Sequence, residues 1–158
     1  MENHELNRQL QKLRALIRKT AEASSQDPEL QAHWGRYLCI LVAGFLENAL
    51  TEVYTDLVDN AASEPVASYA SSVLARIQNP NAQRFLDTAQ LFKPSWAVEL
   101  EQFLMDQGRK EAIDSIMANS HAIAHGRDSG ITIVRVVSYL DKCIEIIEFI
   151  EAQRKGRK

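Results

Sequence analysis

A single long stretch of helical periodicity constrains the fold of this chain more than any other feature of its sequence. From Asp27 to about Asp59, apolar residues recur every three or four positions, with Asp27 placed as an N-cap and Pro28 in the first turn. The stripe comprises His33, Trp34, Tyr37, Leu38, Leu41, Phe45, Ala49, Val53 and Leu57. At the rise of an α-helix, this segment would be on the order of 45 Å long. It therefore predicts a helix that spans the whole domain and extends towards a partner.

Shorter helical segments flank the long one on both sides. Apolar spacing, with proline, glycine and capping residues at the boundaries, predicts helices over residues 6–17, 63–77, 82–92, 96–104, 110–124 and 132–150. Ser95 and Thr132 are expected to cap the helices that follow them, and Gly126 is expected to stop the helix before it. Residues 131–137 are β-branched but continue into a helical pattern. The sequence thus predicts an all-α bundle, a single domain over residues 1–158, with a basic tail that frays from about residue 154.

Composition restricts the function and the location. The net charge of −3 and the pI near 5.8 exclude a protein that coats nucleic acid through bulk charge, so any contact with RNA must be local. Cys39 and Cys143 lie in apolar helical runs and are predicted to be buried free thiols. The first 19 residues lack the apolar region of a signal peptide, and the apolar run 38–46 is too short to cross a bilayer. We expect a cytoplasmic protein with no membrane partner.

One polar cluster, around the end of the predicted helix 110–124, could carry chemistry. It contains Asn119, Ser120, His121, His125 and Arg127, whereas glycine-rich phosphate loops, CxxC, HExxH and nucleophile-elbow motifs do not occur. His121 and His125 share a helix face, a spacing that suits a metal pair, but no second Cys/His pair offers further ligands. We therefore expect no metal or other cofactor. The alternative is a pair of structural histidines that bond to carbonyls at the helix end.

Residues 119–126, Asn-Ser-His-Ala-Ile-Ala-His-Gly, resemble the signature of HEPN domains of the RiboL-PSP type, which typically carry Asn-Arg-His-x-Ile-Ala-His-Gly. The blocks 34–38, 44–48, 129–132 and 147–151 resemble the same group, and Trp96 with the residues after it is a weaker match. The resemblance covers roughly residues 30–151. It implies a HEPN-like helical bundle that forms a two-fold homodimer.

The same resemblance implies metal-independent cleavage of RNA. In active relatives an arginine and a histidine, four to six residues apart, face their symmetry mates, and the RNA 2′-hydroxyl attacks the adjacent phosphate to leave a cyclic phosphate and a 5′-hydroxyl. The chemistry is sound in itself, because a histidine can take or give a proton near neutral pH and a guanidinium can stabilise the charge on phosphorus. Two copies across a dyad supply both an acid and a base from one motif.

This sequence departs from the motif at the arginine, because the residue five before His125 is Ser120 and the residue six before is Asn119. Loss of a transition-state donor of this kind typically costs about 10²–10³ in rate. His121 and Arg127 could supply positive charge instead. Three explanations stay open: a natural weakened member that keeps the fold for binding, a form inactivated on purpose, and slow activity through His121, His125 and Arg127.

Glu47 is a carboxylate within the apolar run of the long helix. It is either an exposed or ion-paired residue, or it orients His121, His125 or a positive partner, as acidic residues on this helix do in relatives. Trp34, Tyr37 and Phe45 are predicted to be core aromatics before base-stacking residues.

Two functions are therefore predicted. The first is a homodimeric HEPN endoribonuclease of a bacterial stress, toxin–antitoxin or antiviral type, with His125 as general base or acid, RNA as substrate and an antitoxin protein as a further partner. The second is a non-catalytic module that uses the same dimer to bind RNA, a nucleotide or a protein.

Overall fold

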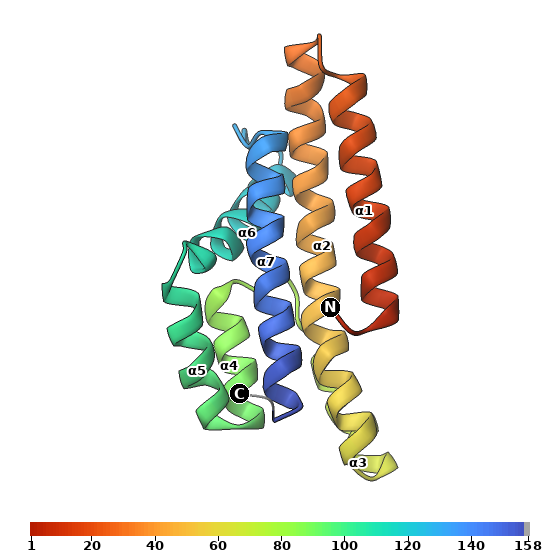
Figure 1. Ribbon diagram of the computed structural model, residues 1–158, viewed down its shortest axis with the longest axis vertical. Coiled ribbons are helices and arrows are strands. Elements are labelled where there is room, and N and C mark those ends of the chain that lie inside the picture. Colours follow the sequence, from red (N-terminus) through yellow and green to blue (C-terminus); the bar gives the residue numbers. More distant parts are fainter. Residues whose placement is uncertain (157–158) are drawn as a thin grey trace.

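The computed structural model describes residues 1–156, which form a bundle of helices joined by short connections (Figure 1). The helices are α1 (His4–Ala23), α2 (Pro28–Ala61), α3 (Glu64–Leu74), α4 (Ala82–Phe92), α5 (Pro94–Met105), α6 (Arg109–Ala124) and α7 (Ile133–Arg154). No strand occurs between residues 1 and 156. The all-α prediction is confirmed.

The long helix α2 is the centre of the bundle. It has 34 residues, which corresponds to about 51 Å, and it contacts α1, α3, α6 and α7. The Asp27 side chain accepts a hydrogen bond from the Leu30 N–H at 3.0 Å, so the predicted cap is confirmed. Leu38, Leu46 and Leu50 are completely buried on the side that faces the other helices. Figure 1 shows α2 running along most of the molecule between α1 and α7.

The aromatic residues of α2 are not all in the core. Phe45 is buried and Trp34 is half-buried, but Tyr37 is 49% exposed. The prediction of core aromatics is therefore wrong for Tyr37. Ile40 and Gly44, which lie on the same side of α2, are also exposed, because the other helices pack against the opposite side.

By length and composition alone, α2 is the one helix among residues 1–156 that could cross a membrane. However, 56% of its apolar window is buried inside the bundle. Its position at the centre of the core accounts for its apolar composition.

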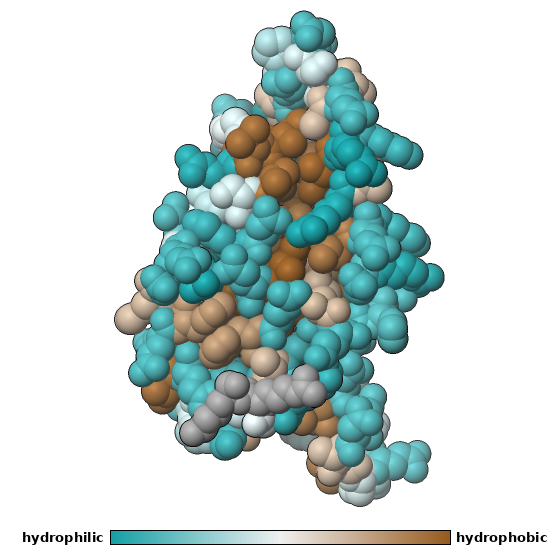
Figure 2. Space-filling view, in the orientation of Figure 1, coloured by the Kyte–Doolittle hydropathy of each residue, from teal (hydrophilic) through white to brown (hydrophobic). Residues whose placement is uncertain are grey.

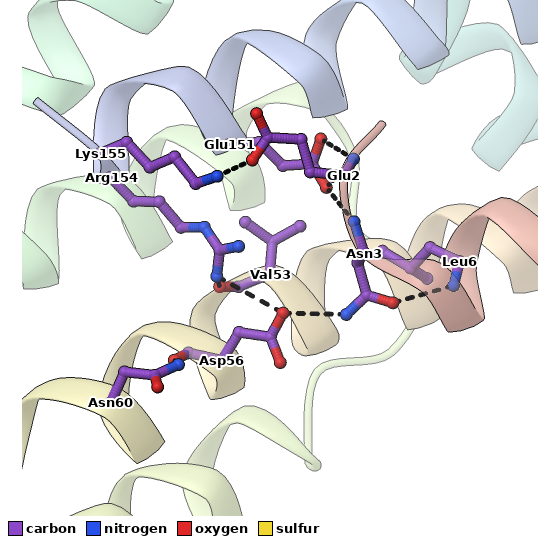
Figure 3. A network of polar contacts seen from close by, with 9 residues as sticks. All are labelled: Glu2, Asn3, Leu6, Val53, Asp56, Asn60, Glu151, Arg154 and Lys155. Atoms are coloured by element: carbon purple, nitrogen blue, oxygen red, sulfur yellow. Dashed lines mark hydrogen bonds and ion pairs between the residues drawn. The ribbon is translucent and has the colours of Figure 1, made fainter. Parts of the chain in front are cut away.

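The start of α1 is held by side chains from two other helices (Figure 3). Glu151 of α7 is buried, and its carboxylate accepts hydrogen bonds from the N–H groups of Glu2 at 2.9 Å and Asn3 at 3.2 Å. The Asn3 side chain caps α1 and also donates to Asp56 of α2 at 2.9 Å. These bonds satisfy N–H groups that a helix start leaves free, and they tie α1, α2 and α7 together.

The end of α7 belongs to the same network. The Arg154 guanidinium donates to the Val53 carbonyl at 3.0 Å, and Lys155 forms an ion pair with Glu2. Arg154 and Lys155, the first two residues of the tail predicted to fray, therefore have partners on the bundle. Residues 157 and 158, the rest of the predicted tail, lie outside the described residues.

Several predicted helix boundaries need correction, among them both ends of α1, which covers His4–Ala23 and not only residues 6–17. Helix α5 begins at Pro94 with Lys93 as its N-cap, so the prediction that Ser95 is the cap is wrong. Proline has no N–H to satisfy and its φ suits a first helical turn, so the helix can begin before the serine. Helix α3 ends at Leu74, three residues earlier than predicted. Cys39 and Cys143 are buried free thiols, as predicted.

The connection between α6 and α7 packs directly on the backbone of α2 at Gly35. A Cβ atom at Gly35 would lie 2.6 Å from the carbonyl oxygen of Ile131, closer than real side chains approach. Only glycine therefore permits this contact. It fixes residues 131–133, and with them the connection that follows His125.

Candidate functional site

Helix α6 ends in a Schellman motif that fixes the backbone around His125. His125 is the C-cap, the Arg127 N–H donates to the Ala122 carbonyl at 2.8 Å, and the Gly126 N–H donates to the Ile123 carbonyl at 3.0 Å. Gly126 has φ of 69°, in the left-handed region that favours glycine. The predicted glycine stop is confirmed, and His125 is presented at a rigid corner rather than on a free loop.

His121 and His125 lie together on the outside of this corner. Their ring centroids are 4.4 Å apart with an angle of 58° between the planes, and both residues are exposed. Two imidazoles side by side on the surface offer ring nitrogens that can donate hydrogen bonds to a ligand or accept them from it. Within residues 1–156, no group of three or more His, Cys, Asp or Glu side chains could hold a metal ion.

Ser120 does not share the histidine face. It is only 6% exposed, on the core side of α6. At 3.6 residues per turn, it lies about 100° around the helix from His121 and about 140° from His125. The serine hydroxyl therefore belongs to the packed side of α6. The aliphatic part of an arginine side chain at this position would have to extend around the helix before its guanidinium could reach the imidazoles.

Asn119 contacts the connection after the corner and not the histidines. Its amide donates to the Ser115 carbonyl at 2.8 Å, and its Oδ1 accepts from the Ser129 hydroxyl at 2.6 Å. The Ser129 oxygen in turn accepts from the Ile131 N–H at 3.3 Å. Asn119 thus sets the path of the connection that carries Arg127, whose side chain is exposed two residues after His125.

Glu47 contacts the backbone of a segment that lies next to His121. Its Oε2 accepts from the Asn79 N–H at 2.6 Å. Asn79 and His121 line the same surface hollow of about 370 Å³, together with Asn81, Gln83, Lys110, Asp114, Met117 and Ala118. Within the described chain Glu47 forms no hydrogen bond or ion pair with either histidine. The hydrogen bond between Glu47 and the Asn79 N–H holds the segment before α4 against α2.

The hollow contains residues that the sequence did not single out. Lys110 and Asp114 form an ion pair at 2.8 Å, and Asp114 also accepts from the Ala82 N–H at 2.9 Å. Lys110, Asp114 and His121 follow one another along α6 at spacings of four and then seven residues, which places all three on one helix face. This spacing is the one feature of the sequence from which the grouping of Lys110 and Asp114 with His121 could have been predicted. The packing of the segment 79–82 against this face joins residues far apart in sequence and could not be inferred from it.

The comparisons with known proteins identify a family for this chain. The family model described as RiboL-PSP-HEPN matches residues 4–153, which confirms the resemblance seen in the sequence. No curated protein and no solved structure matches the chain.

Proposed function

Because the chain belongs to the RiboL-PSP-HEPN family, we propose that it is a metal-independent endoribonuclease scaffold that works as a homodimer. The observation that carries this proposal is the exposed pair of imidazoles, His121 and His125, at a backbone corner that the Schellman motif holds rigid. Family membership supports an RNA-related scaffold. The reaction, the dimer and the roles of the residues are our inference.

The proposed reaction needs two proton transfers. An imidazole of His125 takes the proton from the RNA 2′-hydroxyl as its oxygen forms a bond to the adjacent phosphorus. The bond from phosphorus to the 5′-oxygen then breaks, and a protonated imidazole gives its proton to that oxygen. The products are a cyclic phosphate and a 5′-hydroxyl. The second imidazole is His125 of the other copy, with His121 beside it.

We propose that this chain is attenuated because no guanidinium occupies the position of Ser120. A buried serine cannot stabilise charge at phosphorus, and removal of such a donor typically costs about 10²–10³ in rate. Arg127 is exposed two residues after His125 and provides the remaining permanent positive charge, and the exposed His121 imidazole lies beside His125. The biological setting we propose is a bacterial toxin, antiviral or stress system in the cytoplasm, with an antitoxin protein as a partner.

The test is to restore the arginine. Ser120→Arg should raise the cleavage of unstructured and structured RNA by about 10²–10³ in the presence of a chelator. Its products should carry cyclic phosphate ends. Ser120→Met, which adds comparable bulk without charge, is the matched control and should leave the rate unchanged.

His125→Ala in the Ser120→Arg background should abolish cleavage. The proposal fails if Ser120→Arg is folded and dimeric yet inert on all RNAs, or if the cleavage does not depend on His125.

A second function, a binding module without catalysis, is favoured by the burial of Ser120 on the core side of α6. In that case the native chain binds RNA, a nucleotide or a protein through the same corner. Fluorescence anisotropy with labelled RNA separates the two. Binding that His121→Ala and Arg127→Ala weaken, with no cleavage in the Ser120→Arg variant, would support the module.

A further inference from the structure

The connection between α6 and α7 contributes to two surface hollows that share its backbone. The first, of about 320 Å³, is lined by residues 129–134 and by residues of α1 and α2 that include Arg36. The second, of about 300 Å³, is lined by residues 130–132 together with Asn119, Arg135 and Tyr139. We call them the Arg36 hollow and the Arg135 hollow. An arginine therefore borders residues 130–132 in each of them.

Neither of these two hollows contains an acidic side chain. The hollow that contains His121, by contrast, includes Asp114 paired with Lys110. Asp128 is the one acidic residue of the connection, residues 125–132, and it lines neither hollow. Although the chain has a net charge of −3, the charge in both hollows is therefore positive.

Arg36 has no counter-ion within residues 1–156, although it is half-buried. Its guanidinium donates to the Nδ1 atom of His33 at 2.8 Å, so its side-chain partner is an uncharged acceptor. Glu29 lies 3.9 Å from the Nε2 atom of the same imidazole and forms no ion pair with Arg36. A guanidinium in this state favours an anionic ligand, and its planar fork matches a phosphate with two parallel hydrogen bonds.

Two exposed arginines extend the positive charge along the connection. The Arg135 guanidinium lies 5.6 Å from the centre of the Tyr139 ring, a contact that orients the arginine without neutralising it. Arg127 is exposed earlier in the connection. Within residues 1–156 neither forms an ion pair. The backbone that carries them is fixed by the close contact at Gly35.

An apolar surface lies beside these charges. Figure 2 shows apolar side chains gathered over the first turns of α7. Helix α7 begins with Ile133 and Val134, which both line the Arg36 hollow, and Val134 is 79% exposed. This combination suits a single strand of nucleic acid, because its phosphates can pair with arginine while an unpaired base covers apolar side chains. A duplex keeps its bases stacked inside and cannot use the apolar surface.

We infer that the Arg36 and Arg135 hollows bind phosphate groups of a single RNA strand, with a base over the apolar start of α7. The connection begins at His125, and Asn119 of the Arg135 hollow lies two residues before His121. A strand held here therefore passes beside the histidine corner. The identity of the strand as RNA rests on the proposed function, whereas the positive charge of the hollows does not.

The test is the salt dependence of binding, measured by fluorescence anisotropy. The probes are a labelled RNA strand and the DNA strand of the same sequence, which lacks the 2′-hydroxyl and cannot undergo the proposed cleavage. Each phosphate contact to a single strand contributes about 0.7 to the slope of log affinity against log salt, measured between about 50 and 200 mM. Both strands should bind the native chain with the same slope, because they share the phosphates.

Substitutions of single arginines identify the contacts. Arg36→Gln and Arg135→Gln should each weaken binding and reduce the slope by about 0.7, whereas Arg36→Lys keeps the charge and should keep the slope. Arg76→Gln is the matched control, because Arg76 is exposed, forms no ion pair within residues 1–156 and lines neither hollow. It should bind as the native chain does. Circular dichroism checks that every variant is folded.

Four results would overturn the inference. They are a native chain that binds neither strand, native slopes in both Arg36→Gln and Arg135→Gln, an equal loss of slope in Arg76→Gln, and tighter binding of the duplex than of the single strand. Uridine monophosphate separates a strand from a free nucleotide. It should compete only weakly with the labelled strand, and competition as strong as that of the unlabelled strand would identify a nucleotide site instead.

The outcomes separate this inference from the proposed function. Reduced slopes in the two arginine variants, without cleavage by the Ser120→Arg variant, would uphold the strand site and refute the nuclease. Cleavage by Ser120→Arg that neither Arg36→Gln nor Arg135→Gln affects, with native slopes in both, would do the reverse.

Discussion

Gly35 provides a direct test of how the α6–α7 connection is positioned. In Gly35→Ala the new Cβ would lie 2.6 Å from the Ile131 carbonyl oxygen and 3.3 Å from the Ile133 nitrogen, whereas ordinary contacts begin at 3.4 Å. The Ile131 carbonyl would have to retreat by about 0.8 Å, the difference between 3.4 and 2.6 Å. Both contacts are to backbone atoms, so no flexible side chain can give way.

The expected cost follows from two opposing terms. Overpacking at so close a contact should lower the free energy of unfolding by about 2–3 kcal/mol, near the upper end of the usual range. The higher helix propensity of alanine should offset about 1 kcal/mol of this loss. The net loss of about 1–2 kcal/mol should lower Tm by about 2–8 °C for a chain of this size. Thermal unfolding followed by circular dichroism measures it.

Gly130→Ala is the matched control within the same connection. A Cβ at Gly130 would meet nothing within 4 Å, and its φ lies outside the left-handed region. This substitution should be neutral or raise the free energy of unfolding by about 0.4–1 kcal/mol, because alanine restricts the unfolded chain. If Gly35→Ala stabilises the protein to the same extent as Gly130→Ala, the close contact with α2 does not constrain the connection.

Two further predictions follow from the contacts that the structure shows. Asn119→Ala should lower the free energy of unfolding by about 1 kcal/mol, because the hydrogen bond that positions Ser129 is lost. Hydrogen exchange at the Ile131 amide, which donates to Ser129, should become several-fold faster. Unchanged exchange would contradict the positioning role of Asn119. Burial raises the pKa of the Cys39 thiol to about 12, so the folded thiol should resist maleimide at pH 8. The thiol of the unfolded chain ionises at its ordinary pKa, so stability should fall as pH rises from about 9 towards 12, and rapid labelling of the native protein would contradict the burial.

The features that the sequence predicted correctly are local. Asp27 and Thr132 act as caps because their side chains bond the N–H groups three residues ahead, a contact that short-range spacing already defines. Gly126 ends α6 for an equally local reason, the need for a positive φ. The long helix and the paired histidines follow from helical periodicity, which places residues four apart on one face.

The features that the sequence did not predict depend on which segments meet. Periodicity identifies the apolar stripe of α2 but not how wide an arc its neighbours cover, so Tyr37 was assigned to the core although it is exposed. Glu47 was predicted either to be exposed or ion-paired, or to orient His121, His125 or a positive partner, and neither alternative named its bond to the Asn79 N–H, 32 residues later in the chain. Asn119 belongs to the motif by sequence and to the α6–α7 connection by contact, because Ser129 folds back onto it.

The histidine corner and the missing charge are physically separate. The corner depends on the Schellman motif, the Asn119–Ser129 bond and the close contact at Gly35, and none of these involves the side chain of Ser120. Because Ser120 lies on the packed side of α6, an arginine there would have to carry a long stem past buried neighbours before its charge reached solvent. A serine avoids that cost and keeps the corner intact. Under the proposed function, a chain with serine at this position would keep the geometry that presents His121 and His125 but would lack a cationic group to stabilise the transition state, which is the combination expected of binding without rapid cleavage.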